Sequence, residues 1–252
     1  MLLLIDVGNS NICLGVATKE DIVASFRIKT ILNKTSDEYH VSISNLIQNY
    51  KIENVIISSV VPIVTSALVK CFKEYYNINP TILGPGLKTG IKIKADDPKS
   101  VGADILCDVK GAQIYSDKAI IVDLGTANKY IYYKDNTFMG IAISPGVSIS
   151  MKALVSSAAL LPDIELQVPE KIINNNTISC MQSGIIYSAV SEVDGMIDRI
   201  KEEVNDPNLK VIATGGLSGL IIPLCKNKIE VDSNLCLRGL LQIYLKNEWK
   251  EC

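Results

Sequence analysis

Two segments of the chain place an acidic residue, a glycine and small polar residues at the same spacing. IDVGNSN covers residues 5–11 and VDLGTAN covers residues 122–128, so Asp6 and Asp123 stand at matching positions. Glycine two residues after the acid permits a positive φ and a close approach of the backbone to a ligand. Backbone N–H groups and hydroxyls in such turns can hold phosphate oxygens, and the carboxylate can hold water around Mg²⁺. The repeated motif therefore predicts a phosphate site, with two unrelated β-turns as the alternative.

A third segment, residues 212–216, reads IATGG and ends a predicted strand at Gly215 and Gly216. Two glycines there leave room for a flat ring or a ribose against the backbone. By itself the pattern is better explained by an ordinary strand-to-helix turn, which needs flexible residues. It supports a nucleotide site only together with the two Asp-x-Gly motifs.

Asp104 lies near the start of a predicted helix, and Asp108 follows four residues later on the same helix face. A carboxylate in this place can accept the proton of a substrate hydroxyl during phosphoryl transfer, a reaction that depends chiefly on positioning and charge neutralisation. The alternative is a solvated acid on a helix face, and the spacing alone favours that alternative.

The composition excludes several other kinds of site. The chain has one histidine, His40, which leaves HExxH zinc sites and His₃ metal cages without ligands. Neither GxxxxGK[ST] nor GxGxxG occurs, so a P-loop or Rossmann site is disfavoured. Lys and Arg number 25 against 27 Asp and Glu, and this balance gives no basic excess for nucleic acid or a membrane surface.

Cysteine usage and hydropathy predict a soluble cytoplasmic protein. The seven cysteines, among them Cys252, are scattered and never spaced as CxxC, which is typical of reduced thiols rather than a secreted disulfide framework. No basic segment precedes the first apolar run, so we expect no signal peptide. The longest uncharged apolar stretch, residues 55–69, is interrupted by Pro62 and is too short to cross a bilayer.

Hydrophobic patterning predicts the elements that carry these motifs. The expected strands are residues 2–7, 12–17, 22–28, 55–59, 119–123, 130–133, 137–143 and 210–214. The expected helices are a segment capped by Thr35 and Glu38 that ends near residue 50, then residues 62–76, 98–115, 147–160 and 177–204.

The two Asp-x-Gly motifs lie 117 residues apart, and each opens a run of three predicted strands. An offset of this size indicates two similar half-molecules rather than a solenoid, whose repeats are much shorter. We therefore expect an N-terminal domain over residues 1–117 and a C-terminal domain over residues 118–252, with their acid-bearing turns directed at one nucleotide.

Eight motifs occur in an order that resembles the type III pantothenate kinases. They are DVGNSN (6–11), TSDEY (35–39), SSVVP (58–62), VGAD (101–104), DLGTA (123–127), SPG (144–146), NT with MQSG (176–177 and 181–184) and ATGG (213–216). The similarity extends from residue 1 to about residue 245. It implies two ribonuclease H-like domains of the actin/sugar-kinase type, with mixed five-stranded sheets and a cleft between them.

The resemblance also implies an activity. The family transfers phosphate from ATP to the primary hydroxyl of pantothenate, the first step of coenzyme A synthesis. It uses Mg²⁺ and a monovalent cation such as K⁺ or NH₄⁺, and it acts as a homodimer.

Carried over by position, the resemblance assigns a role to each candidate site residue. Asp104 would be the catalytic base, Asp123 the ligand of the monovalent cation, and Thr177 a contact to the acceptor across the dimer interface. The acceptor pocket would include Gly102, Ala103, Asp104 and Ile105. The ATP site would include Asp6, Val7, Gly8, Asn9, Ser10, Asn11, Ile12, Cys13, Thr126, Gly215 and Gly216, with Asp6 holding Mg²⁺ through water.

The departures from the family pattern gather on the acceptor side. Ile105 replaces an arginine that could pair with the pantothenate carboxylate, and loss of such a bond costs about 1.5–3 kcal/mol. Ala95 replaces a tyrosine, Asp97 an asparagine, and Asn128-Lys129 a Thr-Thr pair. Two alternatives follow: a kinase of the same fold for another hydroxyl acceptor, or a nucleotide-binding regulatory relative. Lys129 could restore a positive charge near the phosphates or the acceptor, with a solvated surface residue as the alternative.

Overall fold

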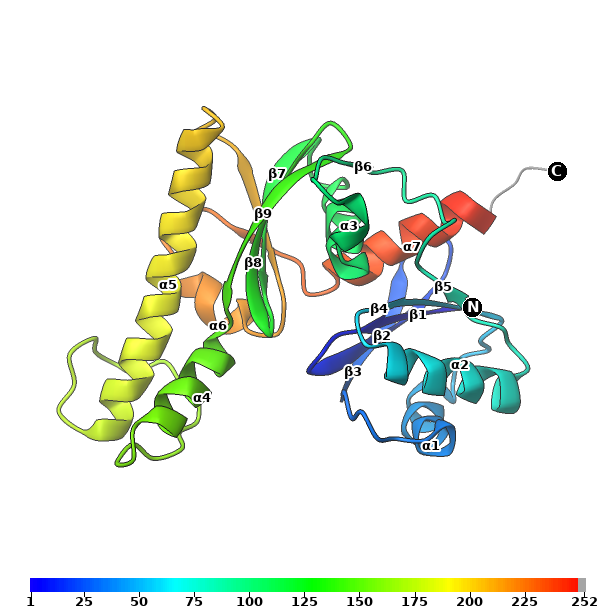
Figure 1. Cartoon of the computed structure of the whole chain (residues 1–252), viewed down its shortest axis with the longest axis horizontal. Coiled ribbons are helices and arrows are strands. Elements are labelled where there is room, and N and C mark those ends of the chain that lie inside the picture. The colour runs from blue at the N-terminus through cyan, green and yellow to red at the C-terminus, as the bar shows by residue number, and fades with distance from the viewer. Residues whose placement is uncertain (249–252) are drawn as a thin grey trace. The chain divides into compact units, whose positions relative to one another are not determined.

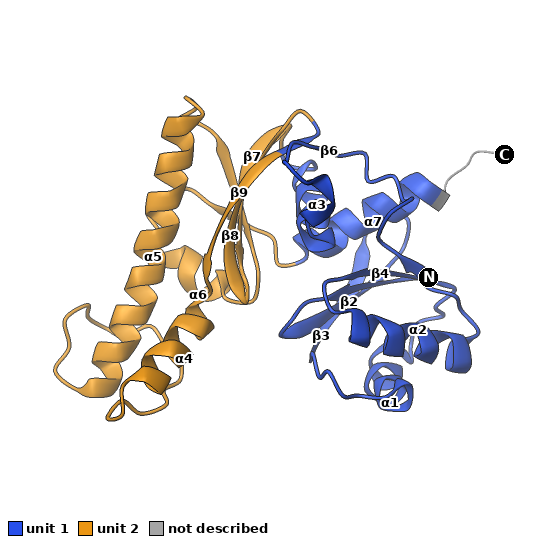
Figure 2. Ribbon diagram, viewed as in Figure 1, with its two compact units in different colours: residues 1–115, 136–138, 234–252 blue, residues 116–135, 139–233 orange. Residues whose placement is uncertain are grey.

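The computed structural model describes residues 1–248, which form two compact units (Figure 2). Unit 1 contains residues 1–115, 136–138 and 234–248, and unit 2 contains residues 116–135 and 139–233. The predicted domain boundary after residue 117 lies close to residue 115, where the first segment of unit 1 ends and unit 2 begins. The structure differs in returning the last helix of the chain to unit 1. Cys252 lies outside the described residues.

Unit 1 is built on a five-stranded sheet in the order β3-β2-β1-β4-β5 (Figure 1). β1 pairs antiparallel with β2 and parallel with β4, so it is the central strand. The predicted strands correspond to β1, β2, β3 and β4, whereas β5 was not predicted. The strands are β1 (Leu2–Val7), β2 (Asn11–Ala17), β3 (Ile22–Lys29), β4 (Asn54–Ser59) and β5 (Thr81–Ile82).

Helices cover both faces of this sheet. The side chains of Leu3, Ile5 and Val7 alternate onto the face covered by α1 (Ser36–Ile47) and α2 (Pro62–Tyr76). Leu2 and Leu4 face the other way, toward α3 (Ala103–Ala112) and α7 (Leu235–Glu248). The predicted capping box of α1 is confirmed, because the Thr35 and Glu38 side chains each accept from the other's backbone N–H.

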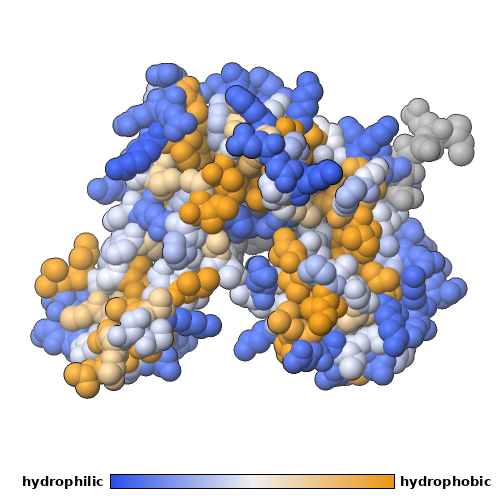
Figure 3. Space-filling view, viewed as in Figure 1, coloured by the Kyte–Doolittle hydropathy of each residue, from blue (hydrophilic) through white to orange (hydrophobic). Residues whose placement is uncertain are grey.

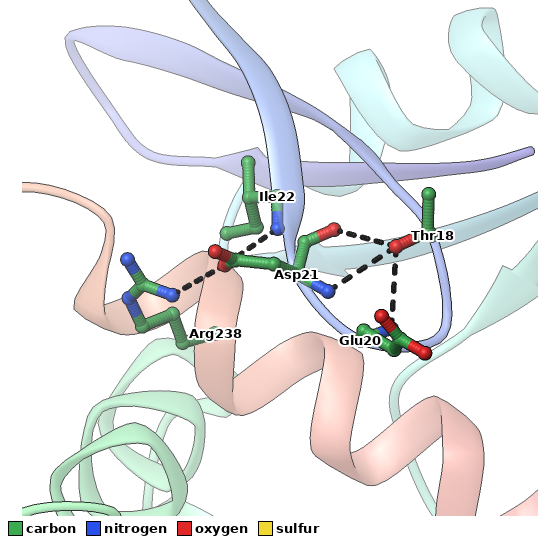
Figure 4. Close-up of polar contacts among 5 residues, drawn as sticks. All are labelled: Thr18, Glu20, Asp21, Ile22 and Arg238. Carbon is green, nitrogen blue, oxygen red and sulfur yellow. Dashed lines mark hydrogen bonds and ion pairs between the residues drawn. The ribbon is translucent and has the colours of Figure 1, made fainter.

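Two glycines allow α3 and α7 to touch. A Cβ atom added to Gly111 would overlap the backbone carbonyl of Leu235, and one added to Gly239 would overlap that of Cys107. A second contact joins α7 to the β2–β3 hairpin, where Arg238 Nη1 lies 2.7 Å from Asp21 Oδ1 (Figure 4). The C-terminal helix is thus a structural part of unit 1.

Unit 2 repeats the strand order of unit 1. The second sheet has the order β11-β10-β7-β8-β9-β6, in which β7 pairs antiparallel with β8 and parallel with β10, as β1 does with β2 and β4. Its strands in unit 2 are β7 (Lys118–Leu124), β8 (Ala127–Lys134), β9 (Thr137–Pro145), β10 (Lys210–Thr214) and β11 (Glu230–Val231). β6 (Lys92–Ile93) extends this sheet to six strands by pairing with residues 137 and 138, which cluster with unit 1.

One face of the unit 2 sheet is covered by helices. Ile120, Val122 and Leu124 of β7 pack with side chains of α5 (Thr177–Glu203) and α6 (Ser218–Ile221). α4 (Val147–Ser157) lies against α5, and a 3₁₀ turn, η2 (Ile222–Leu224), follows α6. The long helix α5 thus holds the core of the second unit, as α1 and α2 do in the first.

The structure corrects one predicted helix. Residues 98–115 do not form one helix but a 3₁₀ turn, η1 (Pro98–Ser100), followed by α3 from Ala103. Val101 and Gly102 have extended backbone dihedrals and separate the two pieces, and the Asp97 side chain caps only the short turn by accepting from Lys99 N. Gly102 is therefore the N-cap of the helix that carries Asp104.

Two general predictions can also be compared with the described residues. The six cysteines among residues 1–248 are free thiols. None of the helices in that range is long and apolar enough to cross a membrane.

Candidate active site

The first Asp-x-Gly turn lies at the carboxyl end of β1 in unit 1. Asp6 is paired in register with Cys13 of β2 and Ser58 of β4. Gly8 N donates to Asn11 O over 3.0 Å, and Thr30 Oγ1 donates to Gly8 O over 2.7 Å. The turn is therefore fixed by its own backbone and by the end of β3, while Asn9, Ser10 and Asn11 are exposed.

The glycines of the two motifs do not use positive φ. Among the described glycines only Gly86, Gly90, Gly140 and Gly215 adopt it, so Gly8 and Gly125 do not use the positive φ that glycine permits. These glycines instead leave room for neighbouring atoms. A Cβ on Gly8 would lie 3.2 Å from Asn11 O, and one on Gly125 would lie 3.5 Å from Asp123 Oδ1. The absence of a side chain, rather than a special dihedral angle, keeps each turn compact.

Asp6 faces a pair of thiols on the α3 and α7 side of the sheet. Burial raises the pKa of the Cys107 thiol, and the charges of Asp6 and Asp108 raise it further. The pKa of Cys236 is also raised, first because its thiol donates a hydrogen bond to Cys107 and then because of burial. Both thiols are neutral at physiological pH, and the carboxyl groups that act on them are those of Asp6 and Asp108.

Asp104 occupies the first turn of α3, two residues after the N-cap Gly102. It is half-buried, whereas Asp108 one turn later is buried with 2% exposure. A carboxylate at a helix N-terminus is stabilised by the helix dipole. The solvated helix-face alternative therefore fits neither acid.

The two residues that depart from the family on the acceptor side are also in unit 1. Ile105 is 9% exposed, and its Cδ1 atom lies near Gly102, so its side chain packs rather than points to water. Ala95 is half-buried in the segment between β6 and η1. These side chains offer apolar surface where an arginine and a tyrosine were expected from the resemblance.

The second Asp-x-Gly turn lies at the carboxyl end of β7 in unit 2. Gly125 N donates to Ala127 O over 3.3 Å, and Gly146 N donates to Thr126 O over 3.1 Å. A Cβ on Gly146 would overlap the carbonyl groups of Gly125 and Thr126. The SPG segment therefore packs directly on the turn and leaves the Thr126 side chain exposed.

Lys129 is the neighbour of Asp123 across the strand pair β7–β8. The two residues are direct register partners, and Lys129 Nζ lies 2.7 Å from Asp123 Oδ2. Their side chains are 17% and 15% exposed. The solvated-surface alternative for Lys129 is therefore wrong.

Gly215 closes the other side of Asp123. Thr214 is the parallel register partner of Asp123, and the chain turns at Gly215 with φ 93°. A Cβ atom there would lie 2.6 Å from Asp123 Oδ1 and equally close to the backbone of Leu124. Gly216 is exposed next to it. The IATGG segment and the second Asp-x-Gly turn thus form one local structure.

The two turns differ in length by one residue. Val7 pairs with Ile12, whereas Leu124 pairs with Asn128. Because successive strand residues point to opposite faces, this shift sends Asn11 to the surface and buries Asn128 at 1% exposure. Asn11 and Asn128 match in the two sequence motifs, but they are therefore not structurally equivalent.

Glu192 of α5 organises a polar cluster that the sequence analysis missed. Its Oε1 atom accepts hydrogen bonds from Tyr130 Oη at 2.8 Å, Asn128 Nδ2 at 3.3 Å and Ser144 Oγ. Burial, and then the Glu192 hydrogen bond, raise the pKa of Tyr130. The sequence does contain a signal for this cluster: Glu192 lies between the apolar residues Ala189 and Val193 on the buried side of a long helix.

A cavity of about 480 Å³ opens beside this cluster. Its walls come from β8, the SPG segment, α4 and α5, and its lining includes Asn128, Leu154, Met181 and Glu192. Thr177 begins α5 and is exposed.

In each unit, therefore, the structure assembles part of the predicted site. Unit 1 holds the Asp6 turn and the Asp104 helix start, and unit 2 joins Asp123, Gly125 and Gly215 with Lys129.

Comparison with known proteins gives a single family. A family model described as type III pantothenate kinase matches residues 2–199. A protein of Acholeplasma laidlawii named type III pantothenate kinase is 43% identical over 247 residues, covering 98% of this chain and 99% of that protein. A protein of Geotalea uraniireducens with the same name is 46% identical over 254 residues, covering 98% and 99%.

Solved structures resemble the fold. A Campylobacter jejuni protein described as a putative Baf family transcriptional activator superposes with a TM-score of 0.60 at 18% identity, covering 97% of this chain and 98% of that one. A putative 2-dehydro-3-deoxygalactonokinase from Sinorhizobium meliloti gives 0.58 at 11% identity, covering 100% and 98%. The architecture is that of the actin/sugar-kinase group, as predicted, except that the second sheet has six strands instead of five.

Proposed function

The chain belongs to the type III pantothenate kinase family, and from that premise we propose that it transfers the terminal phosphoryl group of ATP to the primary hydroxyl of pantothenate. This reaction is the first step of coenzyme A biosynthesis. Similarity over nearly the full length to relatives named for this activity favours it over another acceptor or a regulatory role.

One observation carries the assignment of the site. Asp6 and Asp123 occupy the same position in two sheets of the same strand order, each at the carboxyl end of the central strand and each followed by a tight turn. Unrelated β-turns have no reason to share this position. A duplicated phosphate-binding turn accounts for it.

In unit 1, residues 6–13 are the first phosphate-binding segment. The exposed Asn9, Ser10 and Asn11 offer N–H and hydroxyl donors, which suit phosphate oxygens. The half-buried carboxylate of Asp6, with uncharged Cys13 and Ser58 as its register partners, fits Mg²⁺, which takes one or two carboxylates together with phosphates and waters. When bound, Mg²⁺ would neutralise charge on the phosphates.

Asp104 is the proposed general base. Its carboxylate lies at the start of α3, where it would accept a hydrogen bond from the acceptor hydroxyl and orient that oxygen for in-line attack. Gly102, Ala103 and Ile105 surround it and would form the wall of the acceptor pocket. Ile105 contributes apolar contact only, so the pantothenate carboxylate must be recognised by another group.

In unit 2, Thr126 and the Gly215-Gly216 turn are the proposed nucleotide contacts. Thr126 has an exposed hydroxyl, and the two glycines leave the backbone open to a ribose or an adenine ring. Asp123 lies directly beneath both turns. The monovalent cation expected at Asp123 does not fit, because the ammonium group of Lys129 already lies against this carboxylate.

Exposed apolar side chains gather on unit 2 over α4, the segment that follows it and the start of α5 (Figure 3). Leu160 is 95% exposed and Ile173 is 85% exposed. Apolar surface of this kind marks an interaction site. It supports a homodimer in which Thr177, in the same region, contacts the acceptor bound to the partner.

The test is a kinase assay with ATP, Mg²⁺ and pantothenate, in which ADP release and the phosphorylated product are both measured. The wild-type protein forms 4'-phosphopantothenate, and Asp104→Asn lowers kcat by about 10²–10⁴-fold because the general base is lost. Asp96→Asn, at an exposed acid without an assigned role, is the matched control and keeps full activity. Wild-type turnover equal to that of Asp104→Asn, or turnover only with alcohols that lack the carboxylate, contradicts the proposal.

A further inference from the structure

The ion pair between Lys129 and Asp123 is fixed by the backbone of unit 2. The two residues face each other in the antiparallel register of β7 and β8, so their side chains leave the sheet on the same face. Lys129 Nζ lies 2.7 Å from Asp123 Oδ2, and both side chains are less than one-fifth exposed. An exposed lysine would sample many rotamers, but the ammonium group of Lys129 is held against the carboxylate of Asp123.

The second oxygen of Asp123 is also enclosed. A Cβ atom on Gly215 would lie 2.6 Å from Asp123 Oδ1, and one on Gly125 would lie 3.5 Å from the same oxygen. The carboxylate therefore fills the space that two glycines leave open. It holds an ammonium group on one oxygen and lies against the two turns through the other.

We infer that the Lys129 ammonium is the resident monovalent cation of this turn, and that it makes nucleotide binding and phosphoryl transfer independent of K⁺ or NH₄⁺. The inference rests on the proposed function, because it concerns the charge beside the phosphate-binding turn. Asp123 anchors the ammonium group, and the positive charge of Lys129 offsets the negative charge of a nucleotide phosphate held at the Gly125-Thr126 turn. Lys129 is a positioning and charge-balancing residue and takes no part in bond making.

Electrostatics supports this assignment. A free cation bound to Asp123 would lie within a few ångströms of Lys129 Nζ, and like charges at that separation repel, most strongly where little water screens them. A lysine ammonium carries the same charge as K⁺ and is attached to the chain, so it needs no cation from solution. The corresponding position in unit 1 is Cys13, which is uncharged, so the arrangement is specific to unit 2.

The experiment compares wild type with Lys129→Gln in buffers whose only monovalent cation is tetramethylammonium, with and without KCl. Two quantities are measured: kcat/KM for ATP, and the affinity for ADP by calorimetry. Wild type changes by less than about twofold on addition of KCl, whereas Lys129→Gln loses about 10–150-fold without K⁺. KCl or NH₄Cl then restores the variant, because the carboxylate is free to bind a cation.

Two variants control for folding and for general loss of charge. Lys129→Arg keeps a cation and remains independent of K⁺. Lys134→Gln, at an exposed lysine on the same strand, matches wild type in both buffers. Thermal unfolding of each variant identifies any that fails to fold.

Three results overturn the inference: a wild-type protein that needs K⁺, a Lys129→Gln variant that is as active as wild type without K⁺, or a folded variant that K⁺ does not restore. If no pantothenate phosphorylation occurs in any buffer, the proposed function fails. The ADP affinities then still decide whether Lys129 acts as the cation.

Discussion

The turns after β1 and β7 have almost the same sequence pattern, but the acid of each turn faces a different kind of side chain on the neighbouring strand. Asp6 is paired across the strands with Cys13, next to the neutral thiols of Cys107 and Cys236. Asp123 is paired with Lys129, which neutralises it. The strand opposite Asp6 therefore supplies no charged side chain at this position, whereas the strand opposite Asp123 supplies a cation. The comparison teaches that a duplicated turn can keep its geometry while the opposite strand decides its chemistry.

The second strands of the two sheets, β2 and β8, also differ in the side chains that they direct into the interior. Ile12 and Leu14 of β2 belong to the apolar core of unit 1. The residues in the same register positions of β8 are Asn128 and Tyr130, which donate to Glu192. Unit 2 thus fixes its second strand to α5 by hydrogen bonds at positions where unit 1 has apolar core residues.

The largest expected effect comes from the glycine that distinguishes the second turn. Gly215→Ala introduces a Cβ at positive φ and against Asp123 Oδ1, so we expect a loss of about 2–4 kcal/mol in stability. The melting temperature then falls by about 5–15 °C. Gly8→Ala in the first turn is the matched change, and its Cβ meets only Asn11 O at 3.2 Å. Equal shifts in the two melting temperatures would break the comparison.

The next effect tests the carboxylate of the first turn. Asp6→Asn preserves the shape of the side chain and removes the charge that holds water around Mg²⁺, so the apparent Mg²⁺ requirement rises by about 10–100-fold. Thermal unfolding checks that the variant is folded. The measurement is kinase activity against Mg²⁺ concentration. An Mg²⁺ dependence like that of wild type shows that Asp6 has no such role.

A smaller effect concerns the Glu192 cluster. Tyr130→Phe removes one hydrogen bond to a carboxylate and leaves the donors Asn128 and Ser144 in place, so we expect a loss of about 1.5 kcal/mol. Urea unfolding measures the difference. Tyr132→Phe, two residues further along the same face of the strand, is the control and changes stability by less than about 0.5 kcal/mol. A Tyr130→Phe variant as stable as wild type would mean that the bond contributes nothing.

The smallest effect is a dependence on pH. Burial raises the pKa of Asp194, but hydrogen bonds from Lys226 N, Asn227 N and the Asn227 side chain outweigh it and lower the pKa below 3.8. A carboxyl with a lowered folded-state pKa stabilises the protein above its unfolded pKa and loses that contribution as pH falls through the folded pKa. When the pH is lowered from 5 to below 3.8, the free energy of unfolding of Asp194→Asn therefore falls less than that of wild type.

Asp21 is the matched acid in unit 1. Its pKa is also lowered, chiefly by the N–H of Ile22 and then by Arg238, but its side chain is 63% exposed. Because solvent screens this pair, Asp21→Asn changes the acid sensitivity less than Asp194→Asn. The urea midpoints of both variants and of wild type are measured at pH 5 and again below pH 3.8. A larger change in acid sensitivity for Asp21→Asn than for Asp194→Asn would contradict the prediction.

Several elements could be predicted because their signals are local. The run of apolar residues 2–7 predicts a buried strand, and the Thr35/Glu38 pair predicts a helix start, both of which the structure confirms. Pro62 at the start of α2 is another such signal. Asp97 is a local signal that predicts the wrong helix start, because it caps only a 3₁₀ turn and α3 begins after the extended Val101 and Gly102.

The last helix illustrates what local signals cannot give. α7 was assigned to the C-terminal half, but it packs on α3 in unit 1 through Gly111 and Gly239. Those glycines are more than a hundred residues apart, and neither marks a turn. Only long-range packing makes their missing side chains meaningful.

The sequence alone determined the duplicated turns, most strands and the candidate acids, because strand periodicity and turn chemistry are encoded in neighbouring residues. The tertiary structure decided which side chain faces each acid. A difference of one residue in turn length sets the register of β2 and β8, and register selects Cys13 opposite Asp6 and Lys129 opposite Asp123. The charge of each turn is therefore fixed by pairing between strands, a property that no short segment of the chain contains.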